Sequence, residues 1–192
     1  RMLVFGGVDA SGRVNDVWAL SLAGTLEWRR LTPSGVLPSG REGHSAILDL
    51  ERARMIVFAG YDGSRVLNDV WALSLSDSPS WSRPPTVAPP AARYRQAAFQ
   101  DPVRQRMVVF GGHNGRRTLN DLWAMSLGET LAWNVLGPSG PPPGRGDGVA
   151  AIYDARRDCM VAYAGPAWNR DVDHVEPRKA VESRHVRGRR VR

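Results

Sequence analysis

One pattern of about fifty residues occurs three times in this chain of 192 residues. Each copy has an apolar run that ends in two small residues, then Asn-Asp and an alternating apolar segment with a tryptophan, and finally a second tryptophan. The copies are spaced 52 or 53 residues apart. The landmark residues are Gly6, Gly7, Trp18 and Trp28, then Ala59, Gly60, Trp71 and Trp81, then Gly111, Gly112, Trp123 and Trp133. A repeat of this length indicates one supersecondary unit stacked on copies of itself, with about three and a half copies in this chain.

Each unit has the pattern of an antiparallel sheet of four short strands. In the unit 41–83, residues 43–49 and the apolar run 54–58 predict the first two strands. Residues 70–75 alternate large apolar with small side chains, as in a half-buried strand, and 80–82 are a short fourth strand around one tryptophan. Because the strands are joined by turn residues and no helical period lies between them, we expect antiparallel rather than βαβ pairing.

The double glycine followed by two spaced aromatic residues resembles the Kelch repeat, the blade of one class of β-propeller. The resemblance covers roughly residues 1–165, with Ala59 in place of the first glycine in the second copy. It implies an all-β fold, an incomplete β-propeller of four-stranded antiparallel blades. The expected blades are a partial one at 1–31, two full ones at 41–83 and 93–136, and a partial one at 145–165.

The predicted blades are too few to close a ring. Closed propellers use about four to eight blades. We therefore expect an open arc, with apolar faces uncovered at both ends and unpaired sheet edges. The chain starts with Arg1, inside the apolar run of a repeat, so we expect it to be part of a longer protein whose further blades are natural partners.

The last residues depart from the repeat. Residues 178–192 carry seven Lys/Arg and one Glu, a net charge of +6, whereas 1–177 carry 19 basic and 18 acidic residues, a net charge of +1. We expect 166–192 to be an irregular or weakly helical basic tail. Two explanations are open. The tail is a genuine extension that contacts nucleic acid, or it is the translation of GC-rich DNA that is frame-shifted or noncoding. We favour the second explanation. Nucleic-acid binding is expected only through 178–192.

The composition excludes several kinds of site and partner. Cys159 is the single cysteine, so no disulfide framework or cysteine-rich metal site is expected. No apolar run approaches the ~20 residues of a membrane span, and no membrane partner is expected. Only one of the 26 basic residues is a lysine, and Ala, Gly and Pro are abundant, which favours a bacterial source with GC-rich DNA. The compartment is not identified, with a lean to a secreted or cell-envelope protein.

The loops that differ between units are the candidate binding site. In an antiparallel blade, the second-to-third and fourth-to-first connections lie at the same edge, which we call the rim. Loops on a rigid scaffold are common binding sites. The rim candidates are Asp9, Arg13, Tyr61, Asp62, Arg65, His113, Asn114, Arg116 and Arg117. Their arginines could pair with carboxylates or phosphates, or could simply be solvated.

Arginine also recurs before the first strand of each unit. Arg41, Arg93 and Arg145 stand there, and Asp16, Asp69 and Asp121 recur before the third strand. The arginines either line the mouth of a central channel or pair with the repeated aspartates, and we favour the pairing.

No catalytic arrangement is visible in the sequence. The four histidines show no pair at metal-ligand spacing, and the double glycine precedes a strand rather than a helix, so it is not a phosphate loop. We predict no catalytic residue, metal or cofactor. The resemblance implies a non-enzymatic interaction scaffold that binds a protein or glycan through the rim. The alternative is a fragment of a propeller enzyme or carbohydrate-binding protein whose catalytic residues lie in other blades.

Overall fold

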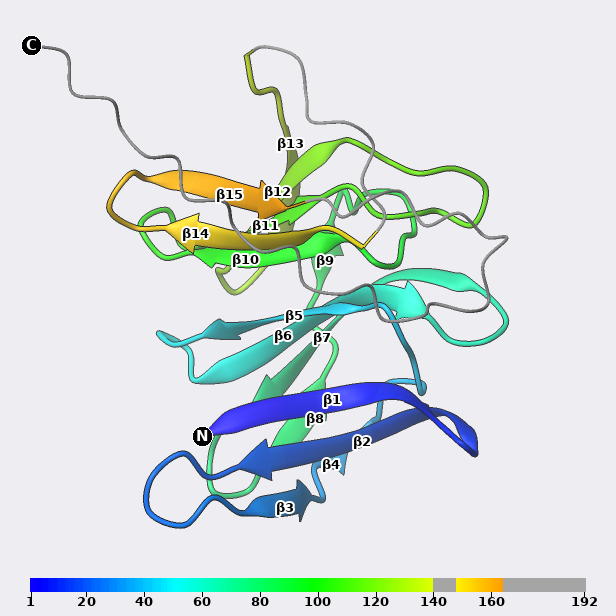
Figure 1. Ribbon diagram of the computed structural model, residues 1–192, viewed down its shortest axis with the longest axis vertical. Coiled ribbons are helices and arrows are strands. Elements are labelled where there is room, and N and C mark those ends of the chain that lie inside the picture. The colour runs from blue at the N-terminus through cyan, green and yellow to red at the C-terminus, as the bar shows by residue number, and fades with distance from the viewer. Residues whose placement is uncertain (140–147, 164–192) are drawn as a thin grey trace, which may run out of the picture.

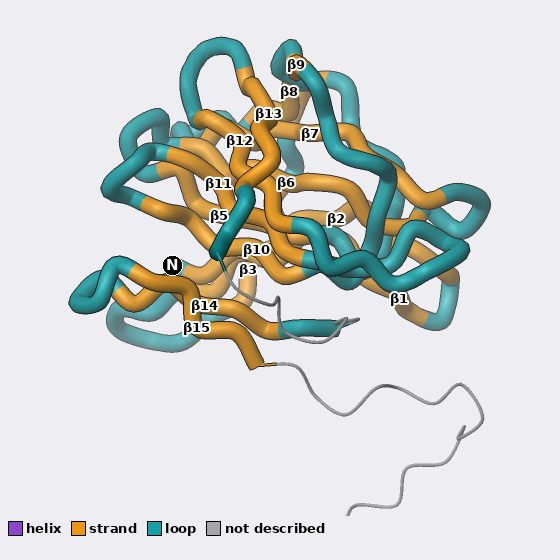
Figure 2. The backbone as a smooth tube through the Cα atoms, turned by 90° about the horizontal axis from the view of Figure 1, so that it is seen from above, coloured by secondary structure: helices purple, strands orange, loops and turns teal. Residues whose placement is uncertain are grey.

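The described part of the chain consists of strands and loops. The computed structural model describes residues 1–139 and 148–163, and neither range contains a helix (Figures 1 and 2). Within these ranges, therefore, no helix is long and apolar enough to cross a membrane. The expected tail at 166–192 lies outside the described residues.

The strands form four sheets that follow one another along the chain. The first has the order β1 (Met2–Asp9), β2 (Gly12–Leu20), β3 (Trp28–Leu31). The second has the order β4 (Ser34–Gly35), β8 (Ser80–Ser82), β7 (Val66–Ser74), β6 (Arg54–Tyr61), β5 (Ser45–Asp49). The third has the order β9 (Thr86–Val87), β13 (Leu131–Leu136), β12 (Leu122–Ser126), β11 (Arg106–Phe110), β10 (Ala97–Asp101). The last is the hairpin of β14 (Ala150–Asp154) and β15 (Cys159–Tyr163).

The sheets are stacked face to face in chain order, from the β1 sheet to the β14–β15 hairpin (Figure 1). Consecutive first strands β5, β10 and β14 lie beside one another, as the inner strands of neighbouring blades do. No barrel or ring closes among the described residues. The prediction of an all-β, incomplete β-propeller is thus confirmed.

The double-glycine position is a β-bulge within a continuing ladder. Phe5 pairs with Val17 and Phe58 with Val70 before the register shifts in both sheets. The residue after each phenylalanine has φ near 63°, whether it is Gly6 or Ala59. Because the bulge lets pairing resume, β2 and β7 begin earlier than predicted. In the first two units the Asn-Asp pair therefore lies inside a strand rather than before it.

The second and third sheets have five strands rather than the four that we predicted. The extra strands β4 and β9 each have two residues, pair in parallel with β8 and β13, and lie in segments that we predicted to be plain links. A strand this short has no periodicity from which it could be recognised in the sequence. Each one hydrogen-bonds the chain that leaves one sheet to the outer strand of the next sheet, as Ser34 N does to Pro79 O at 3.0 Å.

The interfaces between sheets are built on the repeated aromatic residues. Trp81 packs on Phe5 of the preceding sheet with ring centroids 4.9 Å apart, and Trp133 packs on Phe58 at 4.6 Å. Both indoles are almost fully buried, whereas the equivalent Trp28 is 50% exposed because no sheet covers that face of the first sheet among the described residues. Burial of such large rings dominates the stability of each interface.

Candidate functional site

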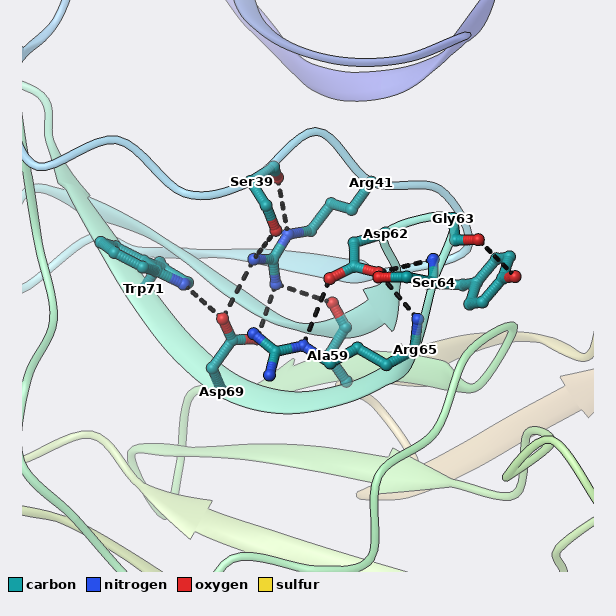
Figure 3. Close-up of polar contacts among 10 residues, drawn as sticks. Ser39, Arg41, Ala59, Asp62, Gly63, Ser64, Arg65, Asp69 and Trp71 are labelled. Atoms are coloured by element: carbon teal, nitrogen blue, oxygen red, sulfur yellow. Dashed lines mark hydrogen bonds and ion pairs between the residues drawn. The ribbon is translucent and has the colours of Figure 1, made fainter.

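The repeated arginines form ion pairs inside the second and third sheets. Arg41 is 1% exposed and donates to both carboxylate oxygens of Asp69, at 2.6 and 3.0 Å (Figure 3). Its guanidinium also donates to Ala59 O, the carbonyl at the bulge, at 3.0 Å. Arg93 makes the same contacts with Asp121, at 2.8 and 2.9 Å, and with Gly111 O. These arginines therefore hold the bulge and the third strand in place within each sheet.

The tryptophan of the third strand completes this arrangement. The indole Nε1 of Trp71 donates to Asp69, and that of Trp123 donates to Asp121, both at 2.7 Å. Burial opposes the ionisation of Asp69, but the hydrogen bonds from Arg41 and Trp71 and the charge of Arg41 outweigh it, so the pKa of this carboxyl lies below its ordinary value. Asp69 is therefore ionised at neutral pH. Arg145 lies outside the described residues.

His44 and Gln96 occupy equivalent positions and link neighbouring sheets. Gln96 Nε2 donates to Phe58 O at 3.2 Å, and the His44 imidazole hydrogen-bonds the equivalent Phe5 O. Burial, aided by the positive charge of Arg41, lowers the pKa of His44 to about 4. His44 is consequently neutral at pH 7 and serves as a structural link between sheets.

Three of the predicted rim residues shape their own loops. A side-chain oxygen of Asp9 accepts from the backbone N–H of Ser11 at 2.7 Å, and one of Asp62 accepts from Ser64 at 2.9 Å. Asn114 accepts from the backbone N–H groups of Arg116 and Arg117, at 3.0 and 2.9 Å. These are Asx turns, in which a short side chain replaces a backbone hydrogen bond. The Asp62 loop is drawn beside the Arg41 pair in Figure 3.

Three other predicted rim residues come together with Tyr94, which was not predicted, in a row across three sheets. The Arg13 guanidinium lies 4.7 Å from the centroid of the Tyr61 ring. Tyr61 lies 5.9 Å from Tyr94, which in turn lies 5.5 Å from His113 in an edge-on arrangement. We call Arg13, Tyr61, Tyr94 and His113 the rim row. Tyr61 and Tyr94 remain partly exposed, while His113 is buried beneath the surface.

The tyrosines and the histidine of the rim row are held by backbone pairing within their own units. Tyr61 bridges Glu42, and Tyr94 bridges His113, each through two backbone hydrogen bonds of 2.9 to 3.1 Å. His113 also accepts from the backbone N–H of Gly115 through Nδ1 at 2.9 Å. A row fixed by the backbone of several units loses little entropy on binding, because its side chains are already positioned.

Charged side chains flank the rim row. Arg13 forms an ion pair with Glu42 at 2.6 Å, with both side chains about one third exposed. The Arg95 guanidinium lies 5.5 Å from the Tyr94 ring, and Arg65 is 78% exposed. Arg116 and Arg117 are exposed in the loop of the third unit. Three residues of this surface were not predicted from the sequence: Tyr94, Arg95 and Glu42. They follow the repeated arginines, and their variation beside Arg41 and Arg93 is the signal that could have identified them.

No metal-binding group is found within the described residues: they contain no cluster of three His, Cys, Asp or Glu side chains. Cys159 lies in β15 as a free thiol.

Comparison with known proteins identifies the protein family. The family described as "KLHDC2/KLHL20/DRC7 Kelch-repeats domain" matches residues 1–176. The chain belongs to this Kelch-repeat family, as the bulge, the paired tryptophans and the stacked sheets indicate.

Individual relatives are similar over most of the chain. Adagio-like protein 1 of Oryza sativa subsp. japonica is 31% identical over 182 residues, which cover 90% of this chain and 28% of that protein. Host cell factor homolog hcf-1 of Caenorhabditis elegans is 32% identical, with 93% of this chain and 25% of that protein covered. Human host cell factor 1 is 34% identical over 74% of this chain and 8% of that protein. The chain thus spans less than a third of the length of these relatives.

Proposed function

We propose that this chain is a non-enzymatic interaction scaffold that binds a protein partner through the rim. Kelch-repeat proteins commonly mediate protein interactions, and the chain belongs to that family. The observation that carries the proposal is the rim row, in which partly exposed tyrosines and an arginine from three units lie side by side. Tyr and Arg are enriched at the centres of protein interfaces.

The chemistry of the rim favours an extended or loop-like protein segment. Tyr61 and Tyr94 offer apolar faces with polar edges, and Arg65, Arg116 and Arg117 offer exposed guanidinium groups around them. Because guanidinium groups bind carboxylates in pairs of hydrogen bonds, acidic side chains of the partner would lie over these loops. Aromatic contacts would supply the affinity, and the charges would orient the segment.

The test uses a peptide-display library of random twelve-residue segments, selected on the full chain and then measured individually. We expect the selected peptides to bind at least ~10-fold more weakly to the double variant Tyr61→Ser, Tyr94→Ser, since loss of central aromatic residues costs more than 1 kcal/mol each. The matched control is Val103→Ser, a 70% exposed residue in a loop at the opposite edge. This control should leave binding unchanged.

Two results would contradict the proposal. Peptides that lose affinity with Val103→Ser and not with the tyrosine variant would place the binding surface on the other edge. Binding of glycans from an array by the full chain, together with no selected peptide, would favour the carbohydrate-binding alternative.

A further inference from the structure

A polar cleft lies between the first and second sheets, which are neighbours in the stack (Figure 1). One wall is formed by residues 29–34, at the end of β3 and in the chain that follows it. The other wall is the loop 76–79, which joins β7 to β8 at the edge opposite the rim. The cleft has a volume of about 370 Å³, enough for a small organic molecule.

Three guanidinium groups line the cleft against a single carboxylate. Arg29 and Arg30 belong to β3, Arg1 precedes β1, and the carboxylate is that of Asp77. Arg1 is held in place by the hydrogen bond that its Nη2 donates to Leu75 O at 3.3 Å. No carboxylate in the described ranges forms an ion pair with Arg29 or Arg30. The excess of positive charge favours an oxyanion, which guanidinium groups bind through paired hydrogen bonds.

Hydroxyl groups supply most of the remaining polar lining. They belong to Thr32, Ser34, Ser76 and Ser78. Ser76 Oγ donates to Ser78 O at 2.9 Å, and its lone pairs remain able to accept a hydrogen bond. Hydroxyl groups and a carboxylate are suitable hydrogen-bond partners for the hydroxyls of a ligand. The lining therefore fits a molecule that carries both an oxyanion and several hydroxyl groups.

The next unit differs at two positions of this cleft. Counted from the tryptophan of the fourth strand, Arg29 corresponds to Ser82, and Ser76 corresponds to Gly128. The same strand and the same loop form in the next unit without these two side chains, so the fold does not require them. Both Arg29 and Ser76 are exposed, and a side chain that the fold does not require is available for a ligand.

We propose that this cleft binds a small hydroxylated molecule that carries a phosphate or sulfate ester, such as a sugar phosphate. Arg1 and Arg29 bind the oxyanion, and the serine and threonine hydroxyls and Asp77 bind the hydroxyl groups of the ligand. Because the arginines are exposed, the charge interaction is weakened by salt, and affinity should fall as ionic strength rises. The site is separate from the rim row and does not rest on the proposed protein partner.

The test is a titration of the isotope-labelled full chain with glucose 6-phosphate, followed by NMR. Glucose is the control that lacks the oxyanion, and inorganic phosphate is the control that lacks the sugar hydroxyls. We expect glucose 6-phosphate to bind at least ~5-fold more tightly than either control, with shifts at the amides of residues 29–32 and 76–78. A parallel titration with glucose 6-sulfate distinguishes a phosphate ester from a sulfate ester as the preferred ligand.

Protein variants locate the oxyanion. Arg29→Ser gives β3 the residue that β8 has at the equivalent position, so this variant should fold, and it should bind glucose 6-phosphate at least ~5-fold more weakly. Arg65→Ser removes one exposed arginine from the rim and should change the affinity less than ~2-fold.

Four results would overturn the proposal. They are equal binding of glucose and glucose 6-phosphate, equal binding of inorganic phosphate and glucose 6-phosphate, an unchanged affinity in Arg29→Ser, and amide shifts confined to other parts of the chain. Each of them is independent of the tyrosine variants that test the rim.

Discussion

Asp69→Asn should destabilise the fold strongly, while the same change at the equivalent Asp16 should not. The Asp69 side chain is 16% exposed, and its two oxygens receive Arg41 at 2.6 and 3.0 Å. An asparagine has nearly the same shape, but it leaves the buried guanidinium without its counter-charge and turns an amide N–H₂ toward it. Breaking one member of a buried ion pair costs about 3–5 kcal/mol. Because asparagine still offers one acceptor, we expect a loss of about 3 kcal/mol in the free energy of unfolding.

The repeat supplies the controls. Asp16 makes the same tryptophan contact and has no arginine partner among the described residues, so Asp16→Asn should cost less than about 1 kcal/mol. Asp121 pairs with Arg93 but its side chain is 37% exposed, and solvent screening should reduce the cost of Asp121→Asn to about 2 kcal/mol. The predicted order of destabilisation is therefore Asp69, Asp121, Asp16.

Urea unfolding followed by tryptophan fluorescence measures the three variants against the parent chain. Midpoints should be compared first, because stacked units can unfold separately. The pKa of Asp69 is lowered in the folded chain, so its stabilisation is complete above the ordinary carboxyl pKa and is lost as pH falls through the folded pKa. The difference between parent and Asp69→Asn should shrink accordingly below about pH 4. An Asp16→Asn loss as large as that of Asp69→Asn would refute the reasoning.

Three further predictions use other equivalent positions. His44 has a pKa of about 4 in the folded chain against an ordinary 6.5, so as the pH falls the unfolded chain takes up the proton first. The free energy of unfolding should therefore fall by about 2 kcal/mol from pH 7 to pH 5. His44→Gln should abolish this loss, and equal shifts of the urea midpoint in both proteins would contradict the prediction. Gly60→Ala should lower the free energy of unfolding by over ~2 kcal/mol, because the residue has a positive φ and its Cβ would clash with a carbonyl. Gly7→Ala should lower it by about 1 kcal/mol, from the positive φ alone. Thermal melts that show equal losses of stability for the two variants would exclude the clash. Trp133→Ala should cost about 3–5 kcal/mol and Trp28→Ala under about 1, because only the first indole is buried, as calorimetry can check.

The candidate site was only partly predictable from the sequence. Loops that differ between matching units were sufficient to select Arg13, Tyr61 and His113. Tyr94 was not predicted, because its ring lies beside that of Tyr61 only when neighbouring sheets stack. Asp62 and Asn114 stay predicted binding residues, and in the structure their side-chain oxygens accept hydrogen bonds within their own loops.

The period of the repeat, by itself, determined that this protein is a stack of small antiparallel sheets, because identical apolar spacing imposes identical packing on each unit. It also determined which tryptophans belong to equivalent positions. Only the tertiary structure decided that β4 and β9 hydrogen-bond to the following sheet and that the rings of Tyr61 and Tyr94 lie near each other at the rim. For the repeated arginines the sequence left two alternatives, of which the structure shows the pairing of Arg41 with Asp69 inside one sheet. The physical reason is that periodicity reports which face of a strand is buried, whereas ion pairs and edge pairing depend on residues far apart in the sequence, which become neighbours only when strands pair and units stack.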